Sequence, residues 1–414
     1  MNAADLDVRD PLAGFRERFI IDDPELIYLD GNSLGRLPVE TVANIASTVR
    51  HEWGNRLIRS WNEHWVDLPR RLGAKLAGLL GAQPQEVIIA DSTSVNLFKL
   101  ALAALQARPA RSRILTDDLN FPSDLYGLRS AARLAGGTKT VEVVSSRDDI
   151  TTPADRIAER IDHDTALVSL SHTTFKSGSV YPMHEITAAA HSAGALILWD
   201  LSHSAGSVPV DLTRAQADLA VGCTYKHLHG GPGSPAFLYV REDLQEELEN
   251  PIHGWFAHRE PFDFSLEFQP VPGIQKFTTG TPPVLSLRAV EAGIDLVAEA
   301  GLPAIREKSI LQTEFMVHLW ERELRELGYR LQSPRQARLR GSHISLGHTH
   351  GLPIDRALID LNVIPDFRHP DNIRLGFSPL YTRFCEIEKA SELMARVVRE
   401  GLYRSYSSRI NEVT

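Results

Sequence analysis

Two apolar runs of the sequence end in side chains that could react with a bound molecule. The run ALILWD ends at a carboxylate, Asp200, and the run DLAVGCTYK ends at an amine, Lys226. A desolvated lysine is a good nucleophile toward carbonyl groups, because burial favours its neutral form. Each residue also has an ordinary explanation, since a strand-end aspartate often caps a helix and most lysines are solvated.

Hydroxyl side chains gather at two further points of the chain. DSTSVNLF places Thr93 and Ser94 next to Ser92 at the expected start of a helix, and SLSH ends another apolar run with Ser171. A helix start binds phosphate through its free N–H groups, although capping explains the same residues. An acid, an amine and a phosphate cradle together match pyridoxal 5'-phosphate. The acid would keep the ring nitrogen protonated, the amine would bind the aldehyde, and the hydroxyls would hold the phosphate.

A sheet is needed to bring these side chains together. Short apolar runs alternate with amphipathic helical segments over residues 86–240. This alternation is typical of an α/β fold, a mostly parallel sheet with helices on both faces. Ligands of such sheets bind at the carboxyl ends of the strands, which is where the candidate residues fall.

The pattern changes near residue 280, where a proline pair precedes a helix and then a long charged helix over 303–327. Weaker strand and helix patterns follow, which indicates a smaller α+β domain. We therefore expect three parts: an N-terminal segment that contributes to the small domain and to an active-site loop, a large cofactor-binding domain, and a small C-terminal domain. Their expected bounds are 1–45, 46–285 and 286–414.

Composition narrows the class of protein. The chain has 414 residues, of which 43% are hydrophobic and 23% charged, with a net charge of −9. No basic stripe favours nucleic acid, and no apolar run reaches the ~18 residues that cross a bilayer. The N-terminus has acids and no apolar core, so no signal peptide is expected. Two cysteines suggest a reducing compartment, so we expect a cytoplasmic protein without nucleic-acid or membrane partners.

GNSLG, around Ser33, fits the G-x-S-x-G pattern of a nucleophile elbow. An elbow raises its serine above a sheet that is already built, yet only about thirty residues precede this motif. We interpret GNSLG as a shaped glycine-rich loop and keep a serine esterase as an alternative.

Six motifs occur in a fixed order between about residues 26 and 385: YLDGNSLG, FPSD, WDLSHSAG, YKHLHGGPG, HGWF and NIRLGFSPLY. Together they resemble the kynureninase family, pyridoxal-phosphate enzymes of the aspartate-aminotransferase fold (fold type I). The resemblance implies hydrolysis of the Cβ–Cγ bond of L-kynurenine, or of its 3-hydroxy form, to L-alanine and anthranilate or 3-hydroxyanthranilate, in tryptophan catabolism. It also implies a homodimer whose active sites take residues from both chains.

The resemblance assigns cofactor roles residue by residue. Lys226 matches the lysine that binds the cofactor, and Asp200 matches the partner of the cofactor's ring nitrogen. Phe121 matches the aromatic ring that stacks on the cofactor. Tyr225 matches a phosphate ligand, and its position beside the lysine suggests that it also relays a proton. The remaining cofactor positions implied are Thr93, Ser94, Asp124, Ser171, His203, Trp255 and Thr281.

Substrate roles follow in the same way. Arg374 in NIRLGF looks like the arginine that binds the substrate carboxylate, and Ser33 belongs to a loop on the substrate side. Trp61 and His64 are candidates for the aromatic end of the substrate. The sequence departs from the family pattern in YKHLHGG, where relatives often carry an aromatic residue and asparagine, and at Thr281, where some have asparagine.

The sequence leaves one alternative enzyme class and argues against a metal site. Another enzyme of the same fold, such as a cysteine desulfurase or an aminotransferase, is the main alternative, although Cys223 and Cys385 lie in an apolar run and at a helix start. A metal site is not expected, because the histidines of KHLHG and SHISLGHTHG lack metal-ligand spacing. We interpret them as polar loop residues.

Overall fold

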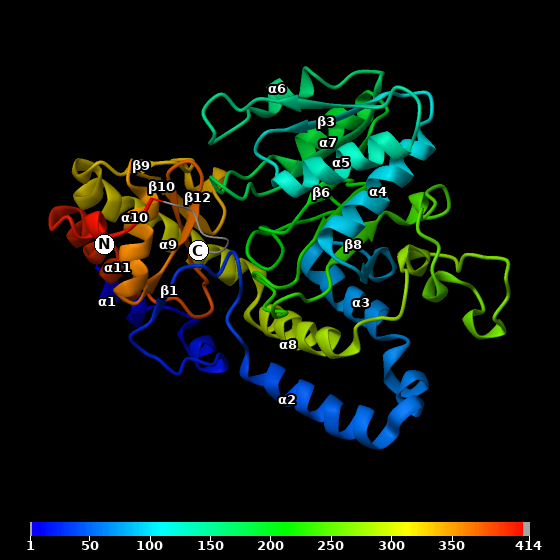
Figure 1. The fold of residues 1–414 in the computed structure, drawn as a ribbon, viewed down its shortest axis with the longest axis horizontal. Coiled ribbons are helices and arrows are strands. Elements are labelled where there is room, and N and C mark those ends of the chain that lie inside the picture. The colour runs from blue at the N-terminus through cyan, green and yellow to red at the C-terminus, as the bar shows by residue number, and fades with distance from the viewer. Residues whose placement is uncertain (1, 409–414) are drawn as a thin grey trace.

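The computed structural model describes residues 2–408 and contains three sheets (Figure 1). The largest sheet has seven strands. Their order is β2 (Val87–Ile89), β8 (Phe237–Val240), β7 (Leu219–Gly222), β6 (Leu196–Asp200), β5 (Thr165–Ser171), β3 (Arg113–Asp117) and β4 (Thr140–Val144). Only β8 runs against its neighbours. The mostly parallel sheet predicted from the alternating runs is therefore confirmed.

Both faces of this sheet are buried, because successive side chains of a strand point to opposite faces. In β6, Ile197 and Trp199 join one hydrophobic core, whereas Leu196 and Leu198 join the other. The helices divide between the two cores accordingly. The first core contains α3 (Leu68–Leu80), α7 (Met183–Ser192) and α8 (Val284–Ala300), and the second contains α4 (Thr93–Ala107) and α5 (Pro122–Leu134). The short α6 (Ala154–Ala158) packs on α7.

A third core surrounds a four-stranded antiparallel sheet in the C-terminal part of the chain. The strand order is β12 (Asp366–Arg368), β13 (Asn372–Gly376), β10 (His343–Gly347) and β9 (Arg330–Leu331). The helices of this core are α9 (Leu302–Leu319), α10 (Gly351–Asp360) and α11 (Phe384–Arg399). The single helix predicted over 303–327 is wrong at its end, because the chain continues after Leu319 as a π turn and a 3-10 turn.

The N-terminal segment packs on this C-terminal part. Strand β1 (Ile27–Tyr28) pairs with β11 (Val363–Ile364), and α1 (Ala3–Val8) lies on α11. Helix α8, although it begins near the predicted boundary at residue 285, packs on α3 with the large sheet. The predicted domain bounds themselves stay a prediction.

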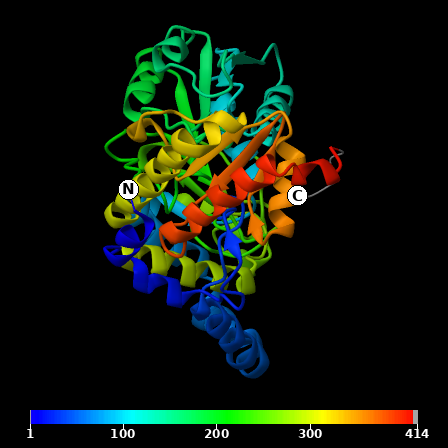
Figure 2. The same cartoon turned by 90° about the vertical axis from the view of Figure 1, so that its left-hand side faces the viewer.

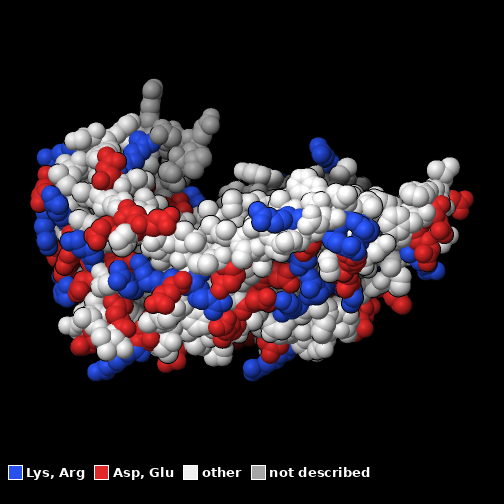
Figure 3. All heavy atoms as spheres, turned by 90° about the horizontal axis from the view of Figure 1, so that it is seen from below, with Lys and Arg blue, Asp and Glu red and all other residues white. Residues whose placement is uncertain are grey.

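Helix α2 (Val39–Ser47) and the helical turns that follow it form an arm that projects from the body (Figures 1 and 2). Charges of both signs are interspersed over the face seen in Figure 3, with no continuous basic strip on it. Among the described residues, no helix is long and apolar enough to cross a membrane.

Candidate active site

Ser171 and Asp200 lie side by side at the carboxyl edge of the large sheet. They are paired in register at the ends of the parallel strands β5 and β6. One Asp200 carboxylate oxygen accepts hydrogen bonds from the backbone N–H of Ser202 at 2.8 Å and from its hydroxyl at 2.6 Å. The sheet therefore places Asp200, and Ser202 in the loop after β6 fixes the direction of its carboxylate.

A second carboxyl lies against Asp200. Asp124 is in the first turn of α5, 3% exposed, and its Oδ2 has no hydrogen-bond partner. Burial, and then the neighbouring Asp200, raise the pKa of Asp124 well above its usual value. Neither carboxyl forms an ion pair with a described residue. Oδ2 of Asp124 thus has no donor within the described residues, and a protonated ring nitrogen bound beside the pair would supply one.

Lys226 lies beyond the end of β7, on the other side of β6 from Ser171. Its Nζ is 2.8 Å from Nε2 of His203, whose Nδ1 has no partner. Burial lowers the pKa of Lys226 and of His203. Both groups are thus pushed toward their neutral forms, in which the lysine amine is a nucleophile.

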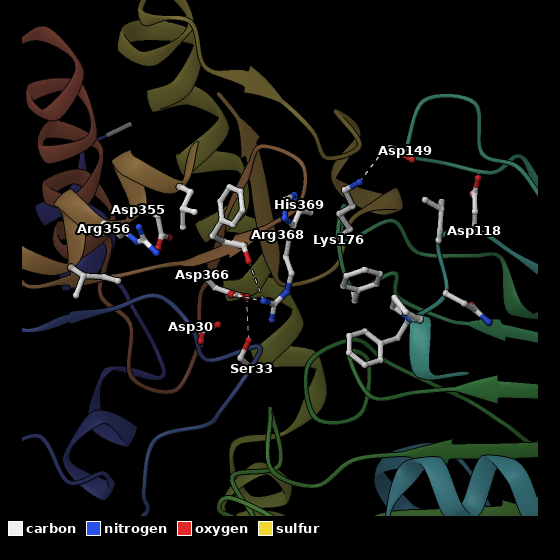
Figure 4. A pocket seen from close by; sticks show the side chains of 18 of the residues that line it. Asp30, Ser33, Asp118, Asp149, Lys176, Asp355, Arg356, Asp366, Arg368 and His369 are labelled. Atoms are coloured by element: carbon white, nitrogen blue, oxygen red, sulfur yellow. Dashed lines mark hydrogen bonds and ion pairs between the residues drawn. The ribbon is translucent and has the colours of Figure 1, made fainter. Parts of the chain in front are cut away.

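Two neighbouring helices, α4 and α5, begin with residues that were predicted to bind the cofactor. Thr93 and Ser94 start α4, and Phe121 directly precedes α5. Ser92 caps α4 by accepting from the N–H of Val95 at 3.4 Å, which leaves Thr93 and Ser94 in the first turn. The ring of Phe121 is 43% exposed and meets the ring of Phe175 edge-on, with centroids 5.2 Å apart. Both phenyl rings line a cavity of about 970 Å³ (Figure 4).

Ser33 lines this cavity, and its hydroxyl contacts the buried Arg374 of β13, which is not itself a lining residue. Nη2 of Arg374 donates to the Ser33 hydroxyl at 2.7 Å and also contacts Asp366. The loop that carries Ser33 packs closely on the lysine loop, since the N–H of Gly35 donates to the carbonyl of Tyr225 at 2.8 Å. A Cβ at Gly35 would lie 2.3 Å from the carbonyl oxygen of Lys226, so this glycine permits the close approach.

Trp255, Trp61 and Thr281 were predicted to contact the cofactor or the substrate, but within the chain they lie apart from Lys226, Asp200 and Arg374. The indole N–H of Trp255 donates to the carbonyl of Pro261 at 2.7 Å, and the ring of Trp61 packs on Phe256. Thr281 is exposed. In the described part of the chain, none of the three hydrogen-bonds Lys226, Asp200 or Arg374. The neighbouring candidate His64 is exposed as well.

Comparisons with known proteins decide the family. A profile described as "Kynureninase C-terminal domain" matches residues 305–394. A kynureninase of Pseudomonas fluorescens is 42% identical over 95% of this chain and 94% of its own length. A kynureninase of Burkholderia mallei (strain SAVP1) is 44% identical over 97% of this chain and 95% of its own. The chain belongs to the kynureninase family.

Solved structures share the fold of this kynureninase-family chain at low identity. The apo cysteine desulfurase of Thermococcus onnurineus NA1 has a TM-score of 0.79 at 20% identity and covers 97% of this chain and 99% of its own. The desulfurase CsdA of Escherichia coli has a TM-score of 0.78 at 18% identity and covers 94% and 98%. At such identities the likeness concerns the fold alone, which is fold type I, as predicted.

The interpretation of the histidines as loop residues holds for His227, His229, His348 and His350 and is wrong for His343. His343 lies inside β10, and His227 and His229 are buried beside the lysine loop. Both ring nitrogens of His343 lack a partner, and its ring centroid is 5.6 Å from that of His203. Burial lowers the pKa of all three. Among the described residues, no group of three ligating side chains could hold a metal.

Sequence reasoning also missed an acidic group beside Arg374, formed by Asp30, Asp355 and Asp366. Asp366 is paired with Arg374 across two strands, and Asp30 and Asp355 line the same cavity (Figure 4). Asp30 follows the apolar run LIYL, so the rule that found Asp200 would also have found it. Asp355 lies within an amphipathic helix, where a carboxylate normally faces solvent, so its pattern gave no signal.

Asp355→Asn is expected to stabilise the protein at pH 8 but not at pH 5. Asp355 is 0% exposed, both its carboxylate oxygens lack partners, and burial raises its pKa to about 7. The native state then keeps a proton that the unfolded chain loses near pH 4, so stability falls as the pH rises from about 4 to 7. Asparagine cannot ionise, so the variant should unfold at a higher urea concentration than the wild type at pH 8. The expected gain in the free energy of unfolding is roughly 2–4 kcal/mol.

The control is Asp360→Asn, on an exposed position of the same helix. It should change stability little at either pH. An equal effect of Asp355→Asn at both pH values would refute the expectation, because an equal effect cannot come from ionisation.

Proposed function

We propose that this chain is a kynureninase. It hydrolyses the Cβ–Cγ bond of L-kynurenine to anthranilate and L-alanine, with pyridoxal 5'-phosphate as its cofactor. The observation that carries the proposal is the position of Lys226 and of the Asp124–Asp200 pair at one edge of one sheet. The chain has this arrangement and is also 42–44% identical to kynureninases over nearly its whole length.

The residues fit the cofactor on chemical grounds. A protonated pyridine nitrogen would supply a donor to this carboxyl pair, in which Oδ2 of Asp124 has no partner, Phe121 offers an open ring face, and Thr93 and Ser94 offer hydroxyls at a helix start. Ser171 lies next to Asp200 in the sheet and completes this wall of the site. When bound, pyridoxal phosphate supplies an electron sink next to the substrate's Cα.

Lys226 moves the protons of the reaction. Its Nζ, whose pKa burial lowers, would hold the cofactor through its aldehyde and, as a free amine, would take the proton from the substrate's Cα. His203, 2.8 Å away, keeps the amine in place. Burial raises the pKa of Tyr225, so its phenol stays protonated and serves as a proton donor and phosphate ligand. Arg374 binds the substrate carboxylate, and Ser33 lies beside it.

The test is a direct assay of the purified protein. It should be yellow, and it should cleave L-kynurenine with release of fluorescent anthranilate. A parallel assay with 3-hydroxy-L-kynurenine ranks the two substrates. If the yellow protein releases no anthranilate from L-kynurenine and no 3-hydroxyanthranilate from the 3-hydroxy form, the proposal fails.

The two thiols argue against a cysteine desulfurase. That reaction needs a reactive thiolate, yet Cys223 is buried and its pKa is raised by burial, and Cys385, at the start of α11, has a pKa raised to about 11. Sulfide release from L-cysteine should therefore be absent. Both thiols are free, which suits the reducing cytoplasm that we propose as the location. Ser33 hydrogen-bonds Arg374 and Asp366 and no described histidine, which disfavours the esterase.

We further propose a homodimer that completes each active site. The arm that follows α2 exposes Trp53 and Ile58, at 57% and 77%, and the loop after Trp255 exposes Phe264 and Leu266, at 74% and 103%. Apolar side chains this exposed favour contact with another chain. Trp255, Thr281 and Trp61 would then reach the cofactor and the substrate of the partner subunit.

Mixing two inactive variants should restore activity if the sites are shared. Lys226→Ala and Thr281→Ala break different halves of a shared site, so each hybrid dimer keeps one complete site. Random mixing after dissociation should recover up to about a quarter of wild-type activity. Sites built within one chain would give no recovery beyond the sum of the two variants. Light scattering of the wild type gives the oligomeric state independently.

A further inference from the structure

The side chain of Arg374 is held by three segments of the chain. Nη2 donates to the Ser33 hydroxyl at 2.7 Å and to a carboxylate oxygen of Asp366, and Nη1 donates to the carbonyl of Phe175 at 2.7 Å. The Ser33 hydroxyl donates to the same Asp366 oxygen at 3.2 Å. Arg374 and Asp366 are each 1% exposed, so this ion pair is removed from water.

The strands place Asp366 where it contacts Arg374. The two residues are directly opposite in the antiparallel pair of β12 and β13, so their side chains are immediate neighbours. The second Asp366 oxygen forms an ion pair with Nη1 of Arg368 at 2.8 Å. Figure 4 shows Asp366 between Arg368 and Ser33. The carboxylate is therefore held on one side by Arg368 while its other oxygen faces Arg374.

An arginine recognises a carboxylate through parallel N–H···O bonds, which require a fixed guanidinium plane. Asp366 also separates two like charges, those of Arg368 and Arg374, which would otherwise repel each other in a buried setting. We propose that Asp366 is a positioning residue: it fixes the plane of Arg374 for the α-carboxylate of the substrate, and Ser33 ties the N-terminal loop to the same pair. This rests on the proposed function, which assigns a carboxylate ligand to Arg374.

Asp366→Asn tests the proposal, because asparagine keeps the shape and an acceptor but loses the charge. We expect KM for L-kynurenine to rise at least about tenfold while kcat stays within about threefold of wild type. Calorimetry of the holoenzyme with L-alanine and L-alaninamide, which lacks the carboxylate, gives a second measurement. The preference of the wild type for L-alanine should shrink at least about tenfold in the variant.

The control is Asp371→Asn in the turn between β12 and β13. Asp371 pairs with Arg330 at the surface, so its loss removes a similar ion pair from the same hairpin and should change neither measurement. Asp366→Glu keeps the charge but moves the carboxylate by one carbon. It should also raise KM, and it replaces Asp366→Asn if that variant does not fold.

Other outcomes overturn the proposal. A lower KM in Asp366→Asn would mean that Asp366 competes with the substrate instead of orienting Arg374. An unchanged KM with a lower melting temperature would leave only a structural role. If the wild type does not cleave L-kynurenine, the proposed function fails, and the comparison of L-alanine with its amide still tests Asp366. A wild type that does not prefer L-alanine overturns the positioning role itself.

Discussion

Replacing Lys226 by alanine is expected to abolish covalent retention of the cofactor and to lower kcat by at least about four orders of magnitude. The amine has two tasks, binding the aldehyde and moving the Cα proton, and the amine of Lys176, which lines the neighbouring cavity, already pairs with Asp149 at 3.0 Å. His203, the group at 2.8 Å, is a poor replacement because burial lowers its pKa well below the usual value. The fold should survive, since alanine removes a buried amine without leaving a charged partner unpaired.

Borohydride reduction followed by peptide mass spectrometry measures the first effect. The wild type should carry the reduced cofactor on the peptide with Lys226, and the variant should carry none. Lys276→Met is the matched control, because Lys276 is 9% exposed and burial lowers its pKa as it lowers that of the half-buried Lys226, yet Lys276 lies in a turn away from this edge. An adduct on Lys276, or activity in Lys226→Ala within tenfold of wild type, would refute the assignment.

The large sheet was predictable because its strands are buried on both faces. Runs such as ALILW and DLAVG bury every residue, so each appears in the sequence as a continuous apolar segment. The polar residue after such a run marks the carboxyl edge, which is why Asp200 and Ser171 were found. The end of α9 was not predictable, since the residues after Leu319 keep a helical composition while the backbone changes to a π turn.

Site residues were predictable only where they directly follow an apolar run or belong to a sequence motif. Asp366 and His343 lie inside short strands of the small sheet, where alternation leads one to expect solvent-facing side chains. Their burial comes from packing between the two parts of the chain. His343 lies 3.1 Å from a Cβ built on Gly178, in the loop after β5, and Arg374 reaches the carbonyl of Phe175 in the same loop. Contacts between segments this far apart leave no periodic signal.

Arg374→Lys is expected to raise KM for L-kynurenine by about two orders of magnitude with a smaller change in kcat. Lysine keeps the charge but cannot donate in a fork, so a carboxylate loses one of two charged hydrogen bonds, worth about 1.5–3 kcal/mol, and the fixed orientation as well. Lysine also leaves a cation near Asp366, whereas alanine would leave this buried carboxylate with Arg368 alone, a destabilisation that would confuse binding with unfolding.

Arg330→Lys is the control for this change. Arg330 is half-exposed, lies on the edge strand β9 of the same sheet and pairs with Asp371, so the same substitution there should leave KM and kcat unchanged. The decisive measurement is the ratio of affinities for L-alanine and L-alaninamide. If Arg374 binds the carboxylate, Arg374→Lys lowers the affinity for L-alanine and leaves that for the amide nearly as it was. Equal losses for both ligands would mean that the guanidinium supports the cavity wall and does not itself bind the substrate.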